Sequence, residues 1–155
     1  MTTKTWANSW WLLGLFMVLS FLVFGFGGLF QPGSWYQSIN KAAWTPPNLA
    51  FPLVWFFLYC LIAITGWRIF SATDHILKWL WVIQMTLNTL WSWLFFGEHW
   101  ASIALLDITL LSASVGALIY RSWRLDMRSV AIMLSPYLAW LALATSLNAY
   151  IVIYN

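Results

Sequence analysis

The sequence predicts an all-α membrane protein, a bundle of five transmembrane helices, on three observations. Hydrophobic residues make up 63% of the 155 residues and charged residues only 7%, whereas soluble domains contain about 25% charged residues. Five apolar stretches are each long enough to cross a hydrocarbon core of ~30 Å, which takes about 20 helical residues. They lack the ~10-residue alternation of outer-membrane barrel strands. The composition excludes a soluble enzyme, a disordered chain and a coiled coil.

The five predicted spans follow one another as a single domain covering residues 1–155. They comprise about residues 10–30, 49–70, 77–96, 101–120 and 130–153. The first could instead be a secretory signal, but its apolar run exceeds the ~7–15 residues of such signals. The only long connection is 31–48. We expect it to form a lid over one end of the bundle, since Pro32, Pro46 and Pro47 stiffen it. The alternative is an aromatic loop that only anchors among lipid headgroups.

The basic residues predict the orientation of the chain. One side of the predicted bundle holds six of them, namely Lys4, Arg68, Lys78, Arg121, Arg124 and Arg128, and the other side holds only Lys41. By the positive-inside rule the N-terminus is cytoplasmic and the C-terminus outside, in a cytoplasmic membrane. The seven basic residues form no continuous stripe, so nucleic acid is not an expected partner.

Three predicted spans each present a face of large rings, two of them with carboxamides. These faces comprise Trp55 and Tyr59; Gln84, Asn88, Trp91 and Phe95; and Tyr137, Trp140, Ala144, Leu147 and Asn148. Each amide alone is more typical of hydrogen bonding between helices. Bulky indoles pack poorly at close helix contacts, however, and suit an apolar pocket with a few polar groups. Together the three faces favour a cavity inside the bundle.

Few other residues offer chemistry. One cysteine, Cys60, and two histidines make no zinc or haem-attachment pattern, so no metal and no resident cofactor is expected. Asp107 is the one acidic residue within a predicted span, and we expect it to hydrogen-bond a neighbouring helix. An alternative is a small secondary transporter that couples protons through Asp107. A structural subunit of a membrane complex is a third hypothesis.

Several motifs, in order along most of the chain, resemble the translocator protein family, whose bacterial members are the tryptophan-rich sensory proteins (TspO/MBR). The matching segments are Trp35-Tyr36, Asn40-Lys41, Trp44-Thr45-Pro46-Pro47, Phe51-Pro52, Trp55, Leu58-Tyr59, Gln84, Asn88, Trp91, Phe95-Phe96, the run Pro136 to Ala142, Ala144-Thr145 and Leu147-Asn148. The resemblance implies a bacterial-type, often dimeric bundle whose cavity is closed by the first loop.

The resemblance further implies a receptor or sensor that binds porphyrins such as protoporphyrin IX, and related hydrophobic ligands, with transport as a further expectation. The ligand-binding positions carried over by motif are Tyr36, Trp44, Pro46, Trp55, Tyr59, Asn88, Trp91, Trp140 and Ala144. Light-dependent porphyrin breakdown involving Trp55 and Trp140 is also implied. Conventional catalysis is not, because neither an acid–base pair nor a metal is available. The Tyr and Arg of sterol-binding relatives are replaced here by Ala149 and Ile153, so sterol binding is not expected.

Overall fold

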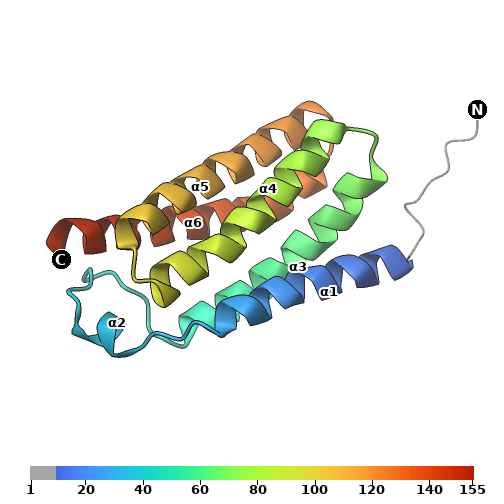
Figure 1. Cartoon of the computed structure of the whole chain (residues 1–155). Coiled ribbons are helices and arrows are strands. Elements are labelled where there is room, and N and C mark those ends of the chain that lie inside the picture. The colour runs from blue at the N-terminus through green and yellow to red at the C-terminus, as the bar shows by residue number, and fades with distance from the viewer. Residues whose placement is uncertain (1–9) are drawn as a thin grey trace, which may run out of the picture.

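The computed structural model describes residues 10–155, and its regular structure in that range is entirely helical (Figure 1). The elements are α1 (Trp10–Gly28), α2 (Ser34–Ser38), α3 (Ala50–Ser71), α4 (His75–Ser92), the π-helical turn η2 (Trp93–Gly97), α5 (Ala101–Arg124) and α6 (Arg128–Tyr154). The all-α fold is therefore confirmed. Lys4, which contributes to the predicted topology, lies outside the described residues.

Four helices of the described chain, α1, α3, α5 and α6, are long and apolar enough to cross a membrane. Helix α4 differs because it has 18 residues before η2 begins and carries His75, Lys78, Gln84 and Asn88. These polar side chains lower its hydropathy. Length and composition thus identify four candidate spans, and the membrane crossing of α4 stays a prediction.

Three helix ends and one additional helix differ from the expectation. Helix α4 begins at His75 rather than at residue 77, because the Asp74 carboxylate accepts a hydrogen bond from the Leu77 amide (2.8 Å) and caps the helix. Helices α5 and α6 extend past their apolar runs, to Arg124 and from Arg128. The short helix α2 lies inside the 31–48 connection, where the sequence analysis expects only a stiff loop.

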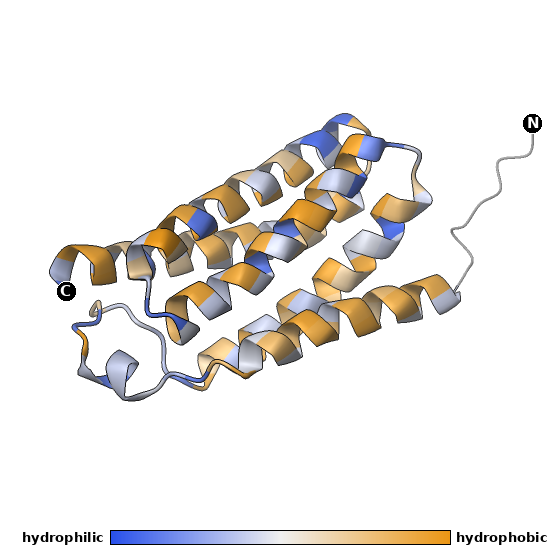
Figure 2. Ribbon diagram, viewed as in Figure 1, coloured by the Kyte–Doolittle hydropathy of each residue, from blue (hydrophilic) through white to orange (hydrophobic). Residues whose placement is uncertain are grey.

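The long helices run roughly side by side (Figure 1). Helix α1 packs on α3, and α5 packs on both α4 and α6. The connection from α1 to α3, the η2–α5 turn and the C-terminus share one end, called the lid end below. The α3–α4 and α5–α6 turns share the other end. Apolar residues dominate the helix surfaces between the two ends (Figure 2).

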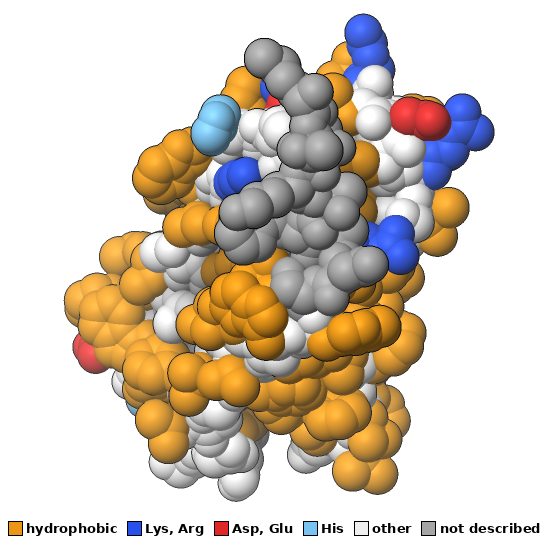
Figure 3. Space-filling view, turned by 90° about the vertical axis from the view of Figure 1, so that its right-hand side faces the viewer, with side chains coloured by type: hydrophobic (Ala, Val, Ile, Leu, Met, Phe, Trp, Pro, Cys, Tyr) orange, Lys and Arg blue, Asp and Glu red, His pale blue; other side chains and the backbone are white. Residues whose placement is uncertain are grey.

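The basic side chains gather at the end opposite the lid end (Figure 3). This end carries Arg68, Lys78, Arg121, Arg124 and Arg128, whereas Lys41 belongs to the lid-end connection. The charge asymmetry expected from the sequence therefore exists in space for the described residues.

Helix α1 docks through a close contact at Gly66 of α3. A Cβ atom at Gly66 would lie 2.6 Å from the Trp81 ring and 2.7 Å from the Phe16 ring. The two rings pack edge to face on each other, with centroids 5.0 Å apart. The Trp81 indole N–H also donates to the Ile62 carbonyl at 3.2 Å. Three helices therefore meet at a position that has no room for a side chain.

We expect Gly66→Ala to destabilise the protein by about 1–3 kcal/mol, because the added methyl overpacks two rings that are already in contact. Thermal unfolding in detergent measures this. Gly14→Ala is the matched control, since a Cβ there meets nothing within 4 Å and alanine favours the helix. An equal loss of stability in both variants would contradict this assignment.

At the basic end, Arg121 binds Asp74 through two hydrogen bonds of 2.9 and 2.7 Å. This pair ties the start of α4 to the end of α5. The Arg121 hydrogen bonds and the Leu77 amide lower the pKa of Asp74 to about 2. Because the unfolded pKa is about 3.9, the pair stabilises the fold above that pH. The contribution is lost as the pH falls from about 4 toward 2.

Asp74→Asn should therefore be less stable than the wild type at pH 7, with the difference shrinking below about pH 4. Asparagine still caps a helix, so the substitution isolates the ion pair. Unfolding temperatures measured from pH 7 to pH 3 test this. The exposed Asp126–Arg128 pair provides the control, because Asp126→Asn should change little. A difference for Asp74→Asn that is independent of pH would refute the assignment.

Candidate functional site

A buried chain of polar side chains crosses the middle of the bundle. The Tyr59 hydroxyl of α3 donates to Asn88 Oδ1 of α4 at 2.5 Å. Asn88 Nδ2 donates to the Tyr137 hydroxyl of α6 at 2.5 Å, and Tyr137 donates to Gln84 Oε1 at 3.2 Å. All four side chains are buried. We call Tyr59, Asn88, Tyr137 and Gln84 the polar chain; it joins three helices.

Helical spacing explains why these groups meet. Gln84 and Asn88 are one turn apart and so lie on one face of α4, as the sequence predicts. On α6 the buried face runs through Tyr137, Leu141, Ala144 and Asn148. Trp140 lies beside this face rather than on it, because its ring packs edge-on against Phe51 (5.6 Å) and is only partly buried. The inner face of α6 therefore carries Leu141 at the place where Trp140 is expected.

Next to the polar chain is a narrow gap between side chains, called the hollow below, which is lined by Trp55, Asn88, Trp91, Ile108, Leu111 and Leu141. The three aromatic faces predict a larger cavity here. The space is too narrow for a water molecule, and sites for drug-sized ligands are about 300–1,000 Å³. Aliphatic side chains from α5 and α6 fill the space between the indoles. The hollow is therefore closed in this structure.

Six of the nine expected ligand residues line this hollow or lie in the core beside it. Trp55, Asn88 and Trp91 line it. The Trp55 ring lies 5.6 Å from the Tyr59 ring and 6.1 Å from the Tyr137 ring. Ala144 is buried in the same core, and Trp140 packs at its edge. The aromatic faces of α3 and α4 thus converge, while α6 contributes Tyr137 and Leu141.

The other three expected residues belong to the connection at the lid end. Tyr36 is half-buried against Phe96 (5.5 Å) and Phe95 (6.2 Å), and burial raises its pKa above the ordinary value. The Trp44 indole donates to Ser146 Oγ at 3.1 Å and remains 54% exposed. Pro46 is partly buried. Tyr36 and Trp44 thus fasten the connection and do not line the hollow.

Two further contacts hold this connection in place. Asn40 and Asn155 exchange hydrogen bonds: the Asn40 amide donates to Asn155 Oδ1 at 2.8 Å, and Asn155 Nδ2 donates to the Asn40 carbonyl at 3.2 Å. The Lys41 ammonium donates to the carbonyls of Tyr36, Gln37 and Ile39 at 2.8, 3.3 and 3.2 Å. The connection is thereby tied to the end of α6, and the exposed carbonyls at the end of α2 are satisfied.

An aromatic stack attaches α2 to the turn between η2 and α5. The Trp35 ring stacks on the His99 ring with centroids 4.4 Å apart and an angle of 18°. Its other neighbour is Phe95 of η2, at 5.6 Å. His99 has a left-handed backbone conformation, with φ of 59°, which few non-glycine residues adopt. This conformation presents its ring to α2.

Asp107 does not make the hydrogen bond expected of it. Its side chain is buried on α5, and its Oδ2 atom has no partner among the described residues. Gln84 Nε2 of the polar chain is likewise without a partner. The expected helix-to-helix role of Asp107 is therefore wrong for this structure. No group of His, Cys, Asp and Glu suited to a metal exists among residues 10–155.

Several residues of the site are absent from the expected ligand positions. Tyr137 is central to the polar chain but is absent from the expected ligand positions; its hydroxyl on a buried face indicated that it needed partners. Leu141, Ile108 and Leu111 were indistinguishable from ordinary core residues. The stack of Trp35 on His99 depends on a left-handed backbone conformation at position 99. A glycine there would have suggested this conformation, but a histidine does not.

Long apolar helices with a polar and aromatic interior define an integral membrane protein of the all-α class. The chain belongs to the TspO/MBR family, whose model matches residues 15–154. It is 39% identical over 127 residues to protein CrtK of Rhodobacter capsulatus, covering 79% of each chain. It is also 34% identical to the tryptophan-rich protein TspO of Archaeoglobus fulgidus, covering 89% of this chain and 94% of the relative. The human translocator protein is 32% identical, over 74% of this chain and 70% of the relative.

We expect Tyr137→Phe to destabilise the fold by about 1–3 kcal/mol, because it takes away the buried partner of Asn88 Nδ2 and of Gln84 Oε1. Tyr154→Phe is the control, since Tyr154 is 59% exposed at the end of α6. Thermal unfolding of both variants in the same detergent measures the difference. Equal stabilities would show that the polar chain does not hold the helices together.

Proposed function

We propose that this protein is a membrane receptor or sensor that binds porphyrins, such as protoporphyrin IX, at the hollow beside the polar chain. The observation that carries the proposal is the convergence of Trp55 and Trp91 with the Asn88 amide around an interior space. Planar macrocycles stack favourably on indole rings. Relatives of this chain carry the names tryptophan-rich sensory protein and translocator protein, which fits a sensor or receptor role.

Binding requires the hollow to widen. Ile108, Leu111 and Leu141 occupy the space that a macrocycle would take, and none of them is held by a hydrogen bond. Their displacement exchanges contacts between aliphatic side chains for contacts with the ligand. Of the polar chain only Asn88 lines the hollow, and its bonds to Tyr59 and Tyr137 would keep the helices in register during this movement. Asn88 would then offer its amide at the edge of the bound ring.

We further propose five spans with α4 included, the N-terminus cytoplasmic and the lid end outside. The apolar residues of α4 and the continuation into η2 support its crossing, because the turn adds length to an 18-residue helix. The basic end supports the orientation. A bacterial cytoplasmic membrane and pairing with a second copy of the chain complete this proposal. Light-dependent breakdown of the bound porphyrin beside Trp55 is a further part of it.

Replacing Trp55 by Leu should weaken protoporphyrin IX binding about two- to tenfold, because a stacked ring pair contributes roughly 0.5–1.5 kcal/mol beyond apolar burial. The dissociation constant is measured in the dark from the porphyrin absorbance. This signal does not depend on the number of tryptophans. Repeating the measurement under illumination shows whether the bound pigment is degraded.

The matched control is Trp79→Leu, because Trp79 is 66% exposed on α4 and does not line the hollow. The affinity of the Trp79→Leu variant for protoporphyrin IX should equal that of the wild type. Equal weakening by both substitutions would locate binding on the outer surface. Absence of saturable binding to the wild type would refute the proposed function itself.

A further inference from the structure

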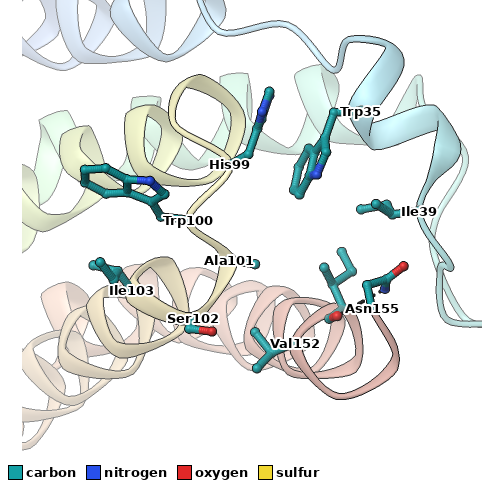
Figure 4. Close-up of a pocket in the computed structure, with 10 residues that line it drawn as sticks. Trp35, Ile39, His99, Trp100, Ala101, Ser102, Ile103, Val152 and Asn155 are labelled. Carbon is teal, nitrogen blue, oxygen red and sulfur yellow. Dashed lines mark hydrogen bonds between the residues drawn. The ribbon is translucent and has the colours of Figure 1, made fainter.

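A second hollow lies apart from the buried one. An open groove of about 440 Å³ lies at the lid end, between α2, the start of α5 and the end of α6 (Figure 4). Trp35 and His99 lie on its α2 side, and Trp100 stands where α5 begins. Its volume falls in the range of small-molecule sites, and its walls mix rings and aliphatic groups with Ser102 and Asn155. The groove therefore suits a planar, largely apolar molecule with polar edges.

One buried side chain bonds to a residue of each lining. Asn148 accepts a hydrogen bond from the Trp91 indole N–H at 3.2 Å and donates to the Ala101 carbonyl at 2.8 Å. Trp91 lines the buried hollow, and Ala101 lines the groove. Asn148 is only 1% exposed. Its amide thus links a residue that lines the hollow to a residue that lines the groove.

We propose that the groove is the entry vestibule for the buried site and that Asn148 is its gate. The inference rests on the proposed function, because the molecule that passes the gate is the porphyrin proposed to bind at the hollow. Opening requires the Trp91 ring to swing away, which breaks its bond to Asn148.

Two features of α4 permit this movement. Trp91 is partly buried and contacts both the main core and the smaller cluster of Leu94, Phe95, Ala104 and Ile151 under the lid end. It also lies two residues before η2 begins, and π-helical turns are frequent at functional sites. Closure needs a group that donates and accepts at once, and a carboxamide provides both.

The test measures the rate constants for association and dissociation of protoporphyrin IX, and their ratio gives its affinity. Association and dissociation of protoporphyrin IX are followed by stopped-flow absorbance in the dark, using the full chain in lipid nanodiscs. Asn148→Leu removes both hydrogen bonds and leaves Trp91 and Ala101 without partners in the closed state. We expect both rate constants to rise about two- to tenfold, the factor that corresponds to one net hydrogen bond, while their ratio changes little.

Thr145→Val is the control, because the Thr145 hydroxyl bonds only to the Leu141 carbonyl of its own helix (2.8 Å). It should leave both rates unchanged. If Asn148→Leu fails to fold, Asn148→Ala makes the same test with a smaller side chain.

Unchanged rates in the Asn148 variant would overturn the gate and indicate entry between helices from the bilayer. A change in dissociation alone would overturn it as well, since Asn148 would then be a ligand contact. If the wild type does not bind at all, the proposed function fails and the gate fails with it. Binding with unaltered rates refutes the gate and leaves the proposed function standing.

Discussion

The polar chain of Tyr59, Asn88, Tyr137 and Gln84 is the constraint on which the interior depends. In an apolar environment each hydroxyl and amide must find a partner inside the protein. The hydrogen bonds between these four side chains fix the rotation of α3, α4 and α6 relative to one another. Trp55, one turn before Tyr59, and Trp91, one turn after Asn88, take their places around the hollow as a result.

The lid end is held by a different kind of interaction. Its contacts are a ring stack at Trp35, amide exchange between Asn40 and Asn155, and the Trp44 bond to Ser146. These groups are mostly exposed, and the apolar cluster beneath Trp35 meets the main core at Trp91. Segments with few buried apolar contacts open at lower free energy than the core around them. The lid end is therefore expected to open at lower free energy than the polar chain.

Periodicity and hydropathy predicted most of the helical architecture, because apolar length and helical spacing are local properties. They placed Gln84, Asn88 and Trp91 on one buried face of α4, and the structure agrees. They did not predict α2, which has only five residues and depends on contacts made elsewhere. Trp140 was assigned to the inner face of α6, but its neighbour Leu141 occupies that place, since one residue is a rotation of only about 100°.

The size of the hollow also escaped prediction, for a related reason. Indoles on converging faces indicate what surrounds a space but not how far Ile108, Leu111 and Leu141 extend into it. That depends on rotamers and on the spacing of α5 and α6. Asp107 shows the same limit, because a burial pattern predicted that it is inside the bundle but not whether a partner is within reach.

Lys41 has a consequence for what the lid end attracts. Its ammonium group directs its hydrogens to three backbone carbonyls of its own segment, whose dipoles offset the cationic field. Glu98, in the turn between η2 and α5, adds a negative charge to this end of the bundle. Long-range steering of anions toward a site depends on unopposed positive potential, which is weak here. An acidic pigment would accordingly be selected at this surface by flatness and ring contacts, and its capture should depend little on ionic strength.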